Sequence, residues 1–260
     1  LDGMTITGNR FTWNGKNETS STHAVFTGYN LGVVIKYNYL DRTPNGIQRK
    51  SNGMTDQSGV IAYNIIKNPK VGIVVKGMNG VRIYNNTFFS ESTPEQTLRG
   101  LIDIHTNFDG GLSAVSAGTK IFNNIFYTRF RTLNIKIYET GCLTGFESDY
   151  NLFWCESGGP IFEVNNEKLS FAQWQEMGYD KHSIVVNPEF MDFTDFIPQS
   201  SLEYGRNLGA DFQSGLSTNA VWGKADPELI IQGLKWQVGA RIHISPGPDT
   251  KISVHPNPVS

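Results

Sequence analysis

The amino-acid sequence predicts an all-β fold: a single-stranded, right-handed parallel β-helix with irregular C-terminal coils and one short helix. Three observations predict it. A short motif centred on Asn recurs through the first 160 residues, a second apolar stretch follows it, and the composition combines 27 glycines with only 18% charged residues. A repeat of this kind is typical of solenoid folds, in which each coil packs only on its neighbours. The composition also suits an extracellular all-β protein.

The motif consists of apolar residues, an Asn and an apolar pair, and it occurs six times. The asparagines are Asn9, Asn38, Asn64, Asn86, Asn124 and Asn151, separated by 29, 26, 22, 38 and 27 residues. One coil of a parallel β-helix has this length. Asn suits the bends between strands because it tolerates left-handed backbone dihedrals, and amides stacked coil on coil can bond to one another. The motif therefore predicts an Asn ladder.

A second strand is expected after each Asn bend, at residues 47–50, 73–76, 102–105 and 135–138. Side chains of a strand alternate between its two faces. The first and third positions are apolar and are predicted to point inward: Ile47, Ile73, Val75, Ile102, Ile104, Ile135 and Ile137. Arg49 departs from this pattern at an inward position. The second and fourth positions are predicted to point outward.

The fourth positions bring together the side chains that are best suited to catalysis. They are Lys50, Lys76, His105 and Tyr138. Neighbouring strands lie about 4.8 Å apart, so the first three are expected to reach a single sugar unit. Asp103, Lys136 and Glu139 are expected beside this column as substrate-binding residues. Arg99 and Asp109 lie on the long loops that are expected to overhang it.

This cluster suits the cleavage of a uronic-acid polysaccharide by β-elimination. The reaction needs a cation that neutralises the carboxylate, so that the C5 proton becomes acidic, and a base that removes the proton. Two adjacent ammonium groups repel each other, which favours a neutral form for one of them. We assign Lys50 as the base and Lys76 as the neutralising cation, with an exchange of roles left open. His105 or Tyr138 is the expected proton donor.

Two other functions remain open at this point. Asp103 and Glu139 fall on neighbouring coils, and a glycoside hydrolase uses such a pair of carboxylates as acid and base. A parallel β-helix can also be a non-catalytic glycan-binding module or adhesin. All three functions imply a monomer whose partner is a polysaccharide. The balance of 22 basic and 24 acidic residues does not favour nucleic acid, and no apolar run reaches the roughly 20 residues of a membrane span.

Three segments resemble a known enzyme family. Residues 47–52 (IQRKSN), 72–77 (GIVVKG) and 84–88 (YNNTF) are similar to the alginate lyases and chondroitinase B. The resemblance implies that Lys50 is the family's basic Lys and that Lys76 stands where the family has Arg. Lys in place of Arg loses the bidentate fork for a carboxylate. The family binds Ca²⁺, so calcium is a further expectation, although its acidic ligands have no clear counterpart here; no other cofactor is expected.

The β-helix domain is expected to span residues 1–244, with regular coils to 165 and irregular coils and a cap over 166–244. Residues 171–178 predict a short helix with Ser170 as its N-cap. Together with residues 148–153 and 178–180, this stretch resembles the closing segment of secreted bacterial β-helix proteins.

The start and end of the sequence carry expectations about location. N-terminal material is expected to be missing. Residues 245–250 form a Pro/Gly linker, and residues 254–259 resemble the opening of a type IX secretion sorting domain, cut short here. The resemblance implies a secreted or cell-surface bacterial protein. Cys142 and Cys155 are expected either to pair or to remain partly buried thiols, since no metal-ligand spacing is present.

Overall fold

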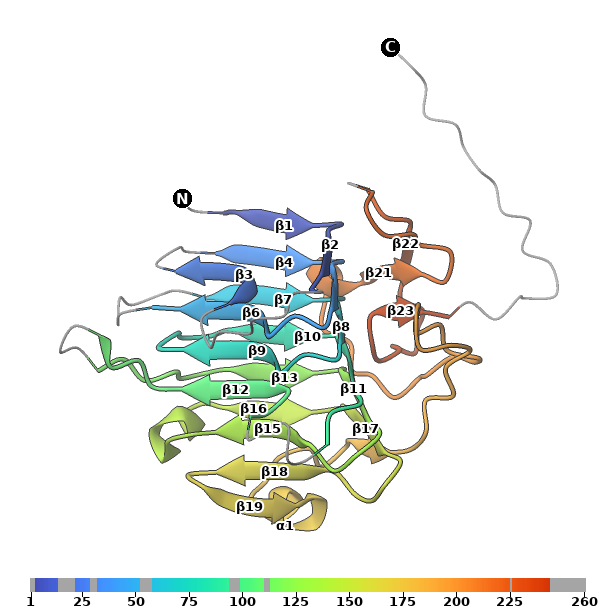
Figure 1. Cartoon of the computed structure of the whole chain (residues 1–260). Coiled ribbons are helices and arrows are strands. Elements are labelled where there is room, and N and C mark those ends of the chain that lie inside the picture. Colours follow the sequence, from blue (N-terminus) through green and yellow to red (C-terminus); the bar gives the residue numbers. More distant parts are fainter. Residues whose placement is uncertain are drawn as a thin grey trace.

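The computed structural model describes residues 3–13, 22–28, 32–51, 58–93, 99–109, 113–224 and 226–243. They form the parallel β-helix that the sequence predicted, with coils stacked one on another (Figure 1). Each regular coil contributes one strand to each of three sheets, here called A, B and C, and its strands pair in parallel with those of the neighbouring coils.

The strands of each sheet follow one another in chain order. Sheet A contains β1 (Thr5–Thr7), β4 (Val33–Lys36), β7 (Gly59–Ala62), β10 (Arg82–Tyr84), β13 (Lys120–Phe122) and β16 (Glu147–Asp149). Sheet B contains β2 (Arg10–Thr12), β5 (Tyr39–Asp41), β8 (Ile65–Lys67), β11 (Thr87–Ser90), β14 (Ile125–Thr128), β17 (Leu152–Cys155) and β20 (Ile184–Val185). Sheet C contains β3 (His23–Gly28), β6 (Asn45–Lys50), β9 (Val71–Lys76), β12 (Ile102–His105), β15 (Leu133–Ile137), β18 (Ile161–Val164) and the antiparallel β19 (Glu167–Ser170).

The predicted Asn ladder runs the length of the stack. The side-chain amide of each ladder Asn donates to the amide oxygen of the next at 3.0 Å, in all five steps from Asn9 to Asn151. The backbone N–H of each donating residue bonds to the same oxygen. From Asn38 onward the ladder residues are fully buried. The ladder therefore pairs polar groups that would be costly to bury alone.

The expectation that the ladder Asn itself adopts the left-handed conformation is wrong. The residue before it does so. Gly8, Tyr37, Tyr63, Asn85, Asn123 and Tyr150 have φ between 52° and 69°. This bend returns the following amide to the carbonyl two residues earlier, as in the bond from Asn64 to the Ala62 oxygen at 3.1 Å. The position therefore needs Asn for its inward amide and not for its backbone conformation.

The inward positions predicted for sheet C are confirmed, whereas the outward residues Val74 and Asp103 are buried as well. The seven inward apolar residues are fully buried in one core cluster. In the same core, the rings of Phe88, Phe126 and Phe153 stack with 4.9 Å between neighbouring centroids. Arg49 also points inward and is fully buried, and its guanidinium donates to the Thr27 hydroxyl at 2.8 Å. Burial lowers the pKa of Arg49 to about 10.

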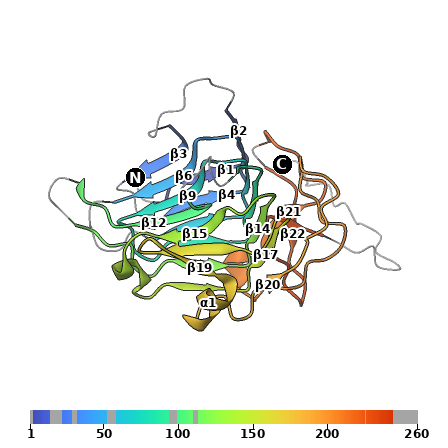
Figure 2. The ribbon, with the colours of Figure 1, turned by 60° about the horizontal axis from the view of Figure 1, so that its bottom comes forward.

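The ladder ends on the fully buried carboxylate of Asp180. Four side chains donate to it at 2.6 to 2.8 Å: Asn151, Ser148, Ser183 and Trp174. The predicted helix is α1 (Phe171–Glu176), and Ser170 caps it as expected. Helix α1 supplies the buried Trp174, whose ring stacks on Phe162 at 4.7 Å. Strand β19 and helix α1 thus cover the end of the stack (Figures 1 and 2).

Residues 186–224 and 226–243, here called the returning segment, run back along the outside of the stack. They include η3 (Ala210–Phe212) and a small sheet of β21 (Ser214–Ser217), β22 (Leu229–Ile231) and β23 (Arg241–Ile242), which lies beside the coils in Figure 1. Another 3-10 turn, η2 (Thr140–Leu143), follows β15. Apolar side chains of the returning segment, such as Phe196, Leu216 and Val238, cluster with Ile65 and Phe89 of sheet B. Both faces of the middle strands of sheet B, such as β8, β11 and β14, are therefore buried.

Three further expectations concern single features of the chain. Cys142 and Cys155 are both free and buried. The linker and the sorting tail fall on residues 244–260, which lie outside the described residues. Within the described part of the chain, no helix is long and apolar enough to cross a membrane.

Candidate functional site

The outer face of sheet C carries the predicted column. Strand pairing places Lys50 opposite Lys76 and Lys76 opposite His105. Tyr138 follows the residue paired with Ile104, and its backbone N–H donates to the Ile104 oxygen at 3.0 Å. The four side chains therefore lie on successive coils in the predicted order. Strand pairing alone creates this arrangement, because it brings together residues 88 positions apart in the sequence.

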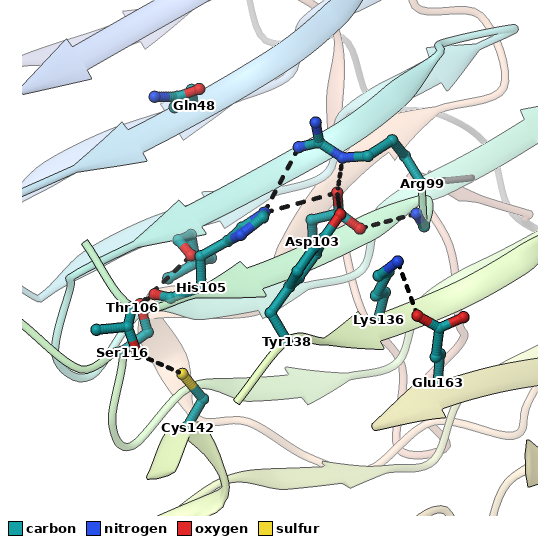
Figure 3. A network of polar contacts seen from close by, with 12 residues as sticks. Gln48, Arg99, Asp103, His105, Thr106, Ser116, Lys136, Tyr138, Cys142 and Glu163 are labelled. Atoms are coloured by element: carbon teal, nitrogen blue, oxygen red, sulfur yellow. Dashed lines mark hydrogen bonds and ion pairs between the residues drawn. The ribbon is translucent and has the colours of Figure 1, made fainter. Parts of the chain in front are cut away.

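His105 and Tyr138 form a stacked pair in this column (Figure 3). Their ring centroids lie 3.7 Å apart, with an interplanar angle of 22°. Arg99, from the loop before β12, contacts both: its guanidinium carbon lies over the Tyr138 ring, 5.9 Å from the centroid, and one terminal nitrogen is 3.5 Å from His105 Nε2. The imidazole thus stacks on an aromatic ring and contacts a cation through Nε2.

Asp103 organises these three side chains from a fully buried position. Its Oδ1 accepts the backbone N–H of Gly100 at 2.8 Å. Its Oδ2 forms an ion pair with Arg99, accepts the Tyr138 hydroxyl at 3.4 Å and lies 3.7 Å from His105 Nε2. Burial, followed by the negative charge of Asp103, raises the pKa of Tyr138 well above its usual value. Tyr138 therefore keeps its proton at neutral pH, and Asp103 acts as a positioning residue.

Lys136 lies on the same face but is already paired. Its Nζ lies 2.7 Å from Glu163 Oε1 and 4.4 Å from the Tyr138 ring centroid. Only 10% of the Lys136 side chain and 7% of the Glu163 side chain are exposed. Lys136 was expected from the sequence to bind substrate, whereas Glu163 was not singled out. The period-two pattern of residues 161–164 was the signal that places Glu163 on the outer face.

Glu139 does not join Asp103. Its Oε2 accepts the backbone N–H of Thr106 at 2.7 Å and lies 3.7 Å from Cys142 Sγ. These contacts hold Glu139 at the end of sheet C, where it supports the loop after β12. The two carboxylates expected for a hydrolase thus each have a partner already: Asp103 pairs with Arg99, and Glu139 is bonded to the loop.

Asp109 reaches the column from that loop. The loop folds back over the ends of β6 and β9, since Asn107 pairs with Ala114 and its side-chain amide donates to the Ser51 oxygen. The Asp109 carboxylate forms an ion pair with Lys50. The hydrogen bond from Lys50, together with the charges of Lys50 and Lys76, holds the pKa of Asp109 below its usual range. A carboxylate therefore already occupies part of the lysine pair.

The structure and the comparisons with known proteins set limits on the site. Among the described residues, no group of three or more His, Cys, Asp or Glu side chains has an arrangement that would hold a metal ion. Comparisons with protein-family models, curated proteins and solved structures found no match. The resemblance to alginate lyases and chondroitinase B thus stays an expectation from the sequence.

Proposed function

We propose that the outer face of sheet C binds an acidic polysaccharide and cleaves it by β-elimination next to a uronic acid. The observation that carries the proposal is the column of Lys50, Lys76 and His105 on three adjacent strands. At about 4.8 Å per strand, the three groups span one sugar unit and the glycosidic bond beside it.

The contact of Asp109 with Lys50 supports a carboxylate ligand. The lysine pair accepts a carboxylate of the protein itself, and that carboxylate is about half exposed, at 49% of its side chain. A uronate that displaced Asp109 would form an ion pair with the same cation, Lys50. Neutral polysaccharides have no group that makes this exchange, so the site favours an anionic chain.

The contacts favour the exchanged roles for the two lysines. Lys50, which already pairs with the Asp109 carboxylate, takes the substrate carboxylate. Within the described residues Lys76 makes no ion pair, and it lies between Lys50 and His105. Lys76 then removes the C5 proton, and the electron pair of the C5–H bond forms the C4=C5 double bond. The C4–O bond breaks, and His105 delivers a proton to the departing oxygen.

Tyr138 has a positioning role in this scheme. Its hydroxyl is directed at the buried Asp103, and His105 separates it from Lys76. A proton that is bound so firmly is a poor donor to a sugar oxygen, but the stacked ring fixes the imidazole. Arg99 contacts the Nε2 atom of the same imidazole and is a further cation beside it.

The test is a panel of acidic polysaccharides incubated with the protein while ultraviolet absorbance is recorded. Alginate, polygalacturonate and chondroitin give products with a C4=C5 double bond conjugated to the carboxylate when a lyase acts on them. We expect rising absorbance with at least one polymer. A flat trace with all of them, together with release of reducing ends, would contradict β-elimination; binding without any product would make the column a glycan-binding surface.

A further inference from the structure

The outer face of sheet C ends in a cavity of about 700 Å³. One wall is the bend before β15, which includes Arg131 and Thr132. The opposite wall is the hairpin of β18 and β19 with the start of α1, which includes Lys168 and Gln173. Apolar residues, among them Leu133 and Ile161, line it together with these polar side chains. A cavity with both apolar and polar lining suits a sugar ring, which has an apolar face and hydroxyl groups at its edge.

The charge of the cavity is positive. Three cations and one carboxylate line it: Arg131, Lys136, Lys168 and Glu163. Lys136 and Glu163 neutralise each other in their buried pair at 2.7 Å. Arg131 and Lys168 are both exposed on the rim and therefore determine the sign of the potential. Gln173 uses its amide oxygen in the helix cap and keeps its amide nitrogen as a further donor.

The cavity is continuous with the column. Strand pairing leads along the outer face from β9 through β12, β15 and β18 to β19. Lys136 belongs to both regions, since its Nζ lies over the Tyr138 ring and its side chain lines the cavity. Four strand spacings separate Lys76 from Lys168, a distance of about 19 Å. A disaccharide does not bridge this distance, whereas a hexasaccharide does.

We propose that the cavity is a distal subsite for a second acidic sugar of the same polysaccharide, with Arg131 and Lys168 binding its anionic group. This inference rests on the proposed function of the column. It implies that the polymer lies across the strands, along the axis of the stack, from β6 at one end to β19 at the other (Figure 2). Long chains then gain contacts that short chains cannot reach.

The test compares chain lengths with and without the rim cations. Labelled di-, tetra- and hexasaccharides of alginate and of polygalacturonate are mixed with the full chain, and fluorescence anisotropy is read before turnover accumulates. The test variant is Arg131→Ala with Lys168→Ala. The control variant, Arg206→Ala with Lys235→Ala, removes one exposed Arg and one exposed Lys from the returning segment. It therefore makes the same change in net charge away from sheet C.

For the wild type we expect hexasaccharide to bind at least tenfold more tightly than disaccharide. The rim variant should lose about tenfold for the hexasaccharide, the size of two exposed ion pairs together, and nothing for the disaccharide. The control variant should keep the length dependence. Equal affinity at all lengths, or an equal loss at all lengths in the rim variant, would overturn the distal subsite alone. Failure of every oligosaccharide to bind would overturn the proposed function as well.

Discussion

At the scale of single residues, the site is defined by which charges are already paired. Asp103 forms an ion pair with Arg99, and Glu163 forms one with Lys136, both in buried or half-buried positions. The Lys50–Asp109 pair differs because the carboxylate is exposed and comes from a loop. An exposed ion pair contributes little to stability and is readily exchanged for another. Asp109 is therefore a displaceable occupant of the site.

Asp109→Asn should tighten the binding of acidic oligosaccharides by about three- to tenfold, because the ligand no longer competes with a carboxylate of the protein. Titration of labelled oligouronates measures this change. The matched control is Glu147→Gln on sheet A, which also has 49% of its side chain exposed and also pairs with a lysine, Lys120. Weaker binding by Asp109→Asn would show instead that Asp109 helps to hold the substrate.

The column itself was predictable from the sequence, but its partners were not. Lys50, Lys76, His105 and Tyr138 share one position of a period-two pattern, and stacking of equal coils fixes their relation. The choice of ion-pair partner depends instead on where loops fold. Glu139 illustrates the difference, because a bond to a loop N–H removes it from the face that its spacing suggested.

At the scale of elements, the ladder explains why the coils stay in register. Asn86 makes a complete set of contacts: its amide donates to Asn124, to the Ile61 oxygen and to the Tyr84 oxygen, and its own oxygen accepts from Asn64. Truncation leaves several buried groups without partners, and each such group costs free energy.

Asn86→Ala should lower the free energy of unfolding by about 3 kcal/mol or more, since it strands donors and acceptors on two neighbouring coils. Urea denaturation followed by circular dichroism measures this loss. The exposed Asn219→Ala is the control and should change stability by less than about 0.5 kcal/mol. A similar, small effect for both would contradict a structural role for the ladder.

The cap predicts a dependence on pH. Burial raises the pKa of Asp180 despite the four bonds that it accepts. The folded protein thus binds this proton more tightly than the unfolded chain. The contribution of Asp180 to stability is therefore fully present below the unfolded pKa of about 3.9 and is reduced as pH rises through the folded pKa.

Asp180→Ala should consequently destabilise the protein more at acidic than at neutral pH. Unfolding free energies of wild type and variant, measured from about pH 4 to about pH 8, give the difference at each pH. The exposed Glu176→Ala serves as the control and should give a constant difference. A difference that grows toward neutral pH would mean that the ionised carboxylate is the form that stabilises the cap.

How well a strand can be predicted from the sequence depends on whether one or both faces of its sheet are covered. Sheet C is open on one side, so its strands alternate and were recognised with the correct register. Sheet B is buried on both sides, so β8 or β11 reads only as an apolar pair after Asn and not as a strand. The sheet B strand of each coil is therefore recognised in the structure, where the returning segment covers its outer face, and not in the sequence.

At the scale of the whole molecule, the outer faces of sheets B and C differ in whether other parts of the chain cover them. The returning segment covers sheet B and joins the stack through a shared apolar cluster and through bonds such as Tyr39 to the Thr194 oxygen at 2.9 Å. The outer face of sheet C carries polar columns and a cavity. One outer face is therefore covered by the chain itself, whereas the other is the face on which we propose that the ligand binds.

Leu216→Ala, in the returning segment, should destabilise the entire molecule by about 2 to 5 kcal/mol, because Leu216 is fully buried against sheet B. Fluorescence and far-ultraviolet circular dichroism should report a single, coincident transition at a lower urea concentration. An additional, earlier transition seen only by fluorescence would show instead that the segment unfolds independently of the stack.

We propose that Lys50 and Lys76 act together on an acidic polysaccharide. The most direct measurement is the rate of unsaturated product formation by wild type, Lys50→Ala, Lys76→Ala and the control Lys120→Ala, with folding checked by circular dichroism. We expect losses of about 10²- to 10⁴-fold for each of the two column variants and an unchanged rate for the control. Full activity in either folded column variant would contradict the proposal.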